Sequence, residues 1–116
     1  MRLPVPDALA GEAAAIAAWA RGEPLIRKVI VFGSRLRQTN RSDSDLDLAV
    51  SIAAPGADEV LLNWMDHQAR WEQELTARLS MTVDLDIADP IVAPHVWSYF
   101  QAGHALIYVA CDKIAT

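Results

Sequence analysis

Two aspartates two positions apart, Asp45 and Asp47, are well suited by type and spacing to hold a hard cation. They open a stretch in which Leu46, Leu48 and Val50 alternate with acidic or small residues, as in a β-strand with one buried face. Side chains two positions apart share a strand face, about 7 Å apart at Cα. Because carboxylate oxygens suit divalent cations such as Mg²⁺, the spacing predicts a site for one or two such ions at the start of this strand.

A second feature, Gly33-Ser34, precedes the aspartates and follows the apolar run 29–32, which reads as a buried strand. Glycine lets a ligand approach the backbone closely, and exposed N–H groups at such a turn can hold an anion, with the Ser34 hydroxyl as a further donor. This turn is therefore expected to bind phosphate. Half of the ten Lys and Arg residues flank it: Arg27, Lys28, Arg35, Arg37 and Arg41. They either neutralise phosphate oxygens or form an ordinary solvated loop, and the sequence leaves both readings open.

Other common cation and phosphate motifs do not fit these residues. A calcium loop beginning at Asp43 needs Gly at its sixth position and Glu at its twelfth, where this chain has Leu48 and Ala54. The Gly-Lys-Ser/Thr of a P-loop and the Gly-x-Gly-x-x-Gly of a dinucleotide fold are also absent from the sequence.

The combination of Gly-Ser, ten residues and Asp-x-Asp resembles the signature of the polymerase-beta-like nucleotidyltransferase superfamily. The short chain is most similar to the minimal nucleotidyltransferase (MNT) branch. In that family the two aspartates bind metal ions that carry a nucleoside triphosphate, and a later strand supplies a third carboxylate. The resemblance points to Asp84, because Val83-Asp84-Leu85 matches the family's Val-Asp-Leu; Asp86, one pleat along, is the alternative. The chain departs from the family pattern at Gln38, where a glycine is usual.

The resemblance also implies an activity and a partner. Two Mg²⁺ ions on Asp45, Asp47 and Asp84, with ATP held by Gly33, Ser34, Arg35 and Arg37, would support transfer of a nucleoside monophosphate, AMP being favoured, to an acceptor hydroxyl. The MNT branch is typically paired with helical HEPN toxins, so the implied acceptor is a toxin tyrosine and the implied role is that of an antitoxin. Two alternatives stay open: an antitoxin that masks its partner without catalysis, and a nucleotidyltransferase acting on a small molecule.

Length, charge and composition limit the possible kinds of protein. With 116 residues and a net charge of −5, the chain is expected to form one domain, residues 1–116, without broad nucleic-acid binding, which usually leaves a basic surface. No apolar run approaches the roughly 18 residues of a membrane span, and the N-terminus lacks a signal-peptide pattern. We therefore expect a cytoplasmic protein without membrane contact. The single Cys111 is expected to be structural or incidental.

The expected fold is α/β, a small mixed sheet of about four strands with helices mainly on one face, of the nucleotidyltransferase type. Helices are predicted over 7–20, from about 57 to 79, and 94–103, with further strands over 81–87 and 105–109. The middle helix carries an apolar stripe that is expected to face the core in part and a partner in part: Leu61, Trp64, Met65, Trp71, Leu75 and Leu79. Trp64, Trp71 and the C-terminal end are the predicted docking surfaces.

Overall fold

The computed structural model describes residues 2–37 and 45–110, so Gln38, Arg41, Cys111 and the C-terminal end lie outside the described residues. A 3₁₀ turn at Asp7–Leu9 leads into the first helix. The chain then forms α1 (Ala10–Arg21), β1 (Ile26–Phe32), α2 (Gly33–Arg37), β2 (Leu46–Ile52), α3 (Ala57–Leu79), β3 (Val83–Ile87), α4 (Pro94–Ala102) and β4 (Ala105–Val109).

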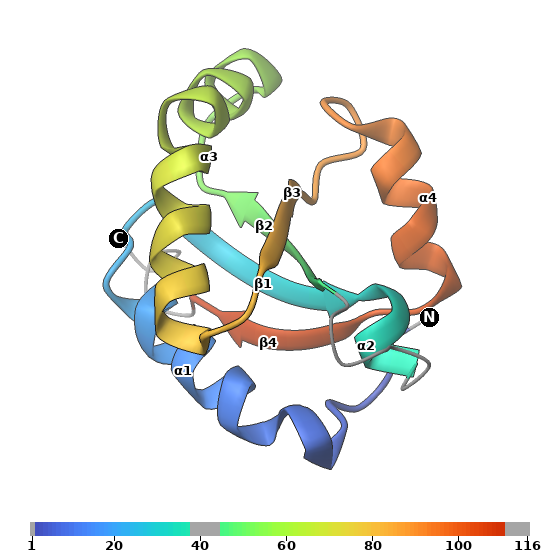
Figure 1. Cartoon of the computed structure of the whole chain (residues 1–116). Coiled ribbons are helices and arrows are strands. Elements are labelled where there is room, and N and C mark those ends of the chain that lie inside the picture. The colour runs from blue at the N-terminus through green and yellow to red at the C-terminus, as the bar shows by residue number, and fades with distance from the viewer. Residues whose placement is uncertain (1, 38–44, 111–116) are drawn as a thin grey trace.

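The four strands form one mixed sheet in the order β3-β2-β1-β4, which confirms the expected fold class. β1 pairs antiparallel with β2 and with β4, whereas β2 pairs parallel with β3. A parallel pair needs a crossover connection, and α3 supplies it. Figure 1 shows α1 and α3 together on one side of the sheet and α4 on the other side.

The helices cover the sheet because each strand is apolar on the face they reach. Val31 and Leu48 are cross-strand partners, both fully buried beneath α1 and α3. On the other face, Phe32 packs edge-on against Phe100 of α4, with ring centroids 5.0 Å apart. Beyond this contact the second face carries the polar and acidic residues of β2 and β3. The sheet therefore has one fully covered face and one face that α4 covers in part.

Helix α3 corrects the docking prediction. Trp71 has no exposed surface and meets Trp19 of α1 edge to face at 6.3 Å, so this tryptophan belongs to the core and is not an interface residue. Trp64 is partly buried and packs against the same core. The exposed apolar side chains of α3 lie in its N-terminal half: Leu61, Leu62 and Met65. The spacing thus predicts the stripe, but in the N-terminal half of α3 Val60 and Trp64 face the core while the other large apolar side chains are exposed.

Two side chains of α3 bond the outer edge of β3. The N–H of Val83 donates to Thr76 Oγ1 at 3.2 Å, and the N–H of Leu85 donates to Glu72 Oε2 at 3.0 Å. Since β3 has a partner strand only on its β2 side, these bonds fix the edge strand to α3. They help to fix the position of β3, and therefore of Asp84 and Asp86, relative to the neighbouring strand β2.

None of the helices in the described part of the chain has the length and apolar character needed to cross a membrane.

Candidate active site

Gly33, in the predicted phosphate-binding turn, lies against Asp47, one of the predicted metal ligands. It begins α2 with a φ of +78°, a conformation that favours glycine. A Cβ at this position would collide with the carboxylate of Asp47, so the backbone turn and this side chain pack directly against each other. Buried Leu36 anchors α2 in the core. The structure therefore brings Gly33 and Ser34 next to the start of β2, as the spacing predicts.

The register of β2 and β3 places Asp84 beside Asp47. These two residues are partners in the parallel ladder, whereas Asp86 is the partner of Ala49, one pleat further along. Asp45 precedes β2 and is exposed, and Asp47 is half-buried. By strand alternation Asp45, Asp47 and Asp84 share the face that α4 leaves open. Of the two aspartates of β3, Asp84 is the one aligned with the Asp-x-Asp pair.

Burial and nearby charges change the pKa of two of these carboxylates, Asp47 and Asp84. Burial, followed by the charges of Asp84, Asp45 and Asp86, raises the pKa of Asp47 to about 6, while Arg37 opposes the rise. Burial and the nearby Glu72 and Asp45 also raise the pKa of Asp84. Mutual repulsion of this kind is what a bound cation relieves. The arrangement is a cluster of oxygen donors beside the Gly33 turn, with Arg37 close enough to act on Asp47.

Comparison with known proteins identifies the family. A family model described as polymerase beta nucleotidyltransferase matches residues 15–107, which include every element from most of α1 to β4. The chain belongs to this family. The nucleotidyltransferase domain thus spans most of the sequence, as the resemblance of its motifs implies. No curated protein matches the sequence.

Two solved structures share the fold of this nucleotidyltransferase domain. One is a toxin–antitoxin with AMP-PNP, with a TM-score of 0.59 and 20% identity over 89% of this chain and 78% of the other. The second is a mutant of the toxin–antitoxin MntA-HpeT, with a TM-score of 0.56 and 18% identity over 87% of this chain and 75% of the other. At these identities the likeness concerns the fold.

Two residues near the carboxylates of the nucleotidyltransferase domain have no signal in the sequence. Glu72 of α3 raises the pKa of Asp84 and Asp86, in each case after burial, which is the larger cause. The charge of His95, in the first turn of α4, acts in the opposite direction on Asp86. Both residues lie on the helices that precede and follow β3, and their approach depends on how these helices pack, which no residue spacing indicates. His95 therefore lies near the acidic face.

The raised pKa of Asp47 predicts a pH-dependent gain in stability on substitution. In the folded state the carboxyl binds a proton more tightly than in the unfolded chain, where its pKa is about 3.9. Without metal, the protonated Asp47 carboxyl therefore contributes to the free energy of unfolding of the wild type below about pH 4. This contribution is lost as the pH rises through about 6. Asp47→Asn, in EDTA, should raise the free energy of unfolding by about 1 kcal/mol at about pH 7.5, a figure reduced for partial solvent exposure. At about pH 4 the gain should nearly vanish.

Urea unfolding of wild type and Asp47→Asn at the two pH values measures this difference. Asp66→Asn is the matched control, because Asp66 is an exposed carboxylate on α3 away from the cluster. An equal difference between wild type and Asp47→Asn at both pH values would contradict the electrostatic picture.

Proposed function

We propose that this domain transfers AMP from ATP to a tyrosine hydroxyl of a helical, HEPN-type toxin and thereby acts as its antitoxin. The observation that carries the proposal is the double contact of Asp47, which packs against the Gly33 turn and pairs in register with Asp84. A triphosphate at this turn would have its α-phosphorus close to the carboxylate cluster. Because the reaction consumes ATP, we place it in the cytoplasm.

The carboxylates fit divalent metal ions by their chemistry. Their oxygens are hard donors, and burial together with nearby carboxylates raises the pKa of Asp47 and of Asp84, a cost that a cation offsets. Within residues 2–37 and 45–110, no three His, Cys, Asp or Glu side chains already stand in a geometry that would hold an ion. Binding would therefore require the carboxylates to turn toward one another. We assign two Mg²⁺ ions to Asp45, Asp47 and Asp84.

The protein's own residues would then act in distinct ways. Gly33 and Ser34 would donate hydrogen bonds to the terminal phosphates, and Arg35 and Arg37 would neutralise their charge. Bound Mg²⁺ would supply activation of the acceptor hydroxyl and stabilisation of the triphosphate charge. The acceptor oxygen forms a bond to the α-phosphorus, the bond to the bridging oxygen breaks, and pyrophosphate leaves. Asp84 would help to take up the hydroxyl proton.

The fold neighbours support the choice of nucleotide and partner. Both are toxin–antitoxin structures, and one contains AMP-PNP, an analogue of ATP. In the other, the mutant carries glutamate in place of two aspartates two positions apart, the spacing of Asp45 and Asp47 here. These features favour a protein acceptor over a small molecule.

The test is to mix the domain with the protein encoded by its neighbouring gene, ATP and Mg²⁺, and to weigh that protein by intact mass spectrometry. We expect an added mass of one or more AMP units on a tyrosine and loss of the partner's toxicity. Neutralisation without any added mass would instead indicate that the domain masks its partner. Transfer to an added small-molecule hydroxyl in preference to the partner would indicate a nucleotidyltransferase that acts on a small molecule.

A further inference from the structure

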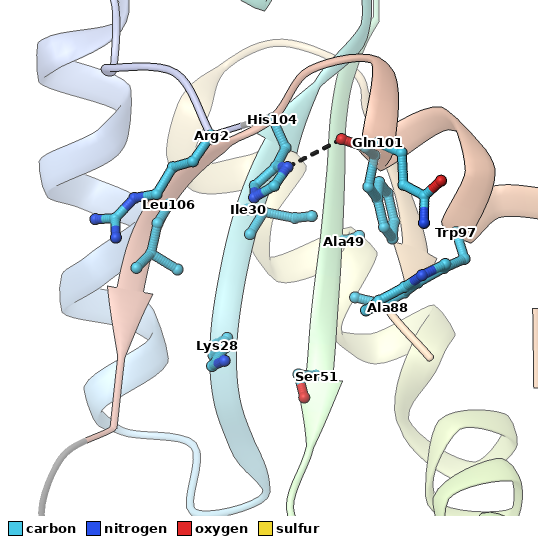
Figure 2. Close-up of a pocket in the computed structure, with 11 residues that line it drawn as sticks. Arg2, Lys28, Ile30, Ala49, Ser51, Ala88, Trp97, Gln101, His104 and Leu106 are labelled. Atoms are coloured by element: carbon cyan, nitrogen blue, oxygen red, sulfur yellow. Dashed lines mark hydrogen bonds between the residues drawn. The ribbon is translucent and has the colours of Figure 1, made fainter. Parts of the chain in front are cut away.

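The partly covered face of the sheet holds a pocket that the proposed transfer does not use. Its cavity is about 330 Å³, with Ile30, Ala49 and Leu106 as its apolar floor (Figure 2). Among the described residues, those that line it include neither the Gly33 turn nor any of the carboxylates. Phe32 follows Ile30 on this face of β1 and packs on Phe100, so this contact lies between the pocket and Gly33. The pocket is a separate cavity of a size that suits a small molecule.

One end of the pocket is built to hold an anion. Lys28 of β1 and Ser51 of β2 are cross-strand partners, so a basic and a hydroxyl side chain leave adjacent strands on this face at the lower end in Figure 2. Arg2, which forms a backbone bridge with His104, adds a second cation on the β4 side, at the level of His104 and not of Lys28. The chain has a net charge of −5. Among the described residues that line this pocket, however, Arg2 and Lys28 are basic and none is an aspartate or glutamate. A phosphate monoester, with two negative charges and several acceptor oxygens, matches these donors.

The other end offers an aromatic wall and both kinds of hydrogen-bonding group. Trp97 forms one side of the cavity, with 36% of its surface exposed. His104 Nδ1 donates to the carbonyl of Phe100 at 2.9 Å, which leaves Nε2 as the ring nitrogen that can bond a ligand. The Gln101 amide lies beside it and supplies both donor and acceptor atoms (Figure 2). A flat heterocycle can stack on Trp97 while these two residues bond its edge.

We propose that this pocket binds a nucleoside monophosphate, with its base against Trp97 and its phosphate on Lys28 and Ser51. The order of the groups along the cavity, an aromatic and hydrogen-bonding end and then a cationic end, is the order of base and phosphate in such a ligand. A triphosphate would bring more negative charge than Lys28 and Arg2 neutralise. The proposal stands independently of the transfer reaction, because the two sites share no residue.

Fluorine NMR of the full chain labelled with 5-fluorotryptophan tests the proposal, with AMP as the probe and EDTA present. The chain has four tryptophans, of which Trp97 alone lines this pocket. AMP should shift the Trp97 resonance in a saturable way and leave the resonances of buried Trp19 and Trp71 in place. Adenosine alone and inorganic phosphate alone should each bind at least about tenfold more weakly, because each makes only part of the contacts.

Matched variants locate the binding site. Lys28→Gln should weaken the AMP titration about tenfold, the effect of losing one charge-assisted contact. Arg27→Gln, at the adjacent exposed residue, which does not line the pocket, should leave the titration unchanged. A Trp97 resonance that does not respond to AMP would overturn the proposal. Equal weakening by both variants would also overturn it, since it would show only a general charge effect.

Discussion

Replacing Asp47 with asparagine is expected to lower nucleotidyl transfer by at least about a thousandfold. Asp47 lies against the Gly33 turn and beside Asp84, so it would share in holding both the triphosphate and the ions. Asparagine keeps the shape of the side chain and removes its charge. Because the substitution also relieves repulsion, the variant should remain folded, and lost activity would report the chemistry. Pyrophosphate release in the presence of the partner protein and Mg²⁺ measures the effect.

Asp66→Asn again serves as the control and should transfer at the wild-type rate, because Asp66 is exposed on α3. If Asp47→Asn kept more than about a tenth of wild-type transfer, the assignment of the carboxylate cluster as the active site would be wrong.

The two aspartates of β3, Asp84 and Asp86, are expected to differ strongly in their effect on transfer. Asp84→Asn should lower transfer about a hundredfold while nucleotide binding is retained, since Asp84 would act on the acceptor side. Asp86→Asn should change transfer by no more than about threefold, because its register partner is Ala49 and not Asp47. Single-turnover assays with calorimetric binding of ATP separate the two steps. The opposite ranking would show that Asp86 is the third carboxylate.

Much of the site could be predicted because its residues are close in sequence. Gly33 and Ser34 directly follow β1, and Asp45 and Asp47 lie just before and within β2, the next strand, so their spacing limits how they can meet. The positive φ of Gly33 and its contact with Asp47 give this spacing a physical reason. The choice between Asp84 and Asp86 is different, because both fit the strand alternation equally well. In the sequence only the resemblance of Val83-Asp84-Leu85 to the family's Val-Asp-Leu favours Asp84, and the register between β2 and β3 adds the physical reason.

The features that the sequence did not indicate all depend on tertiary packing. An apolar stripe shows which side of α3 turns inward, but not how far the helix extends beyond the sheet. For this reason Trp71, expected as part of a docking surface, proves to be fully buried, while Leu62 and Met65 are exposed. The approach of Glu72 to the acidic cluster likewise follows from helix placement and leaves no local pattern.

The hydrogen bonds from β3 to Thr76 and Glu72 have a consequence for self-association. An edge strand with free N–H groups is a template on which another chain can add a strand, and this is a common route to aggregation. At Val83 and Leu85 those groups are already bonded within the molecule. Strand addition along this border would first have to displace α3 side chains. Association at this end of the sheet is therefore directed to side-chain surfaces, and concentrated protein is protected there from edge-to-edge polymerisation.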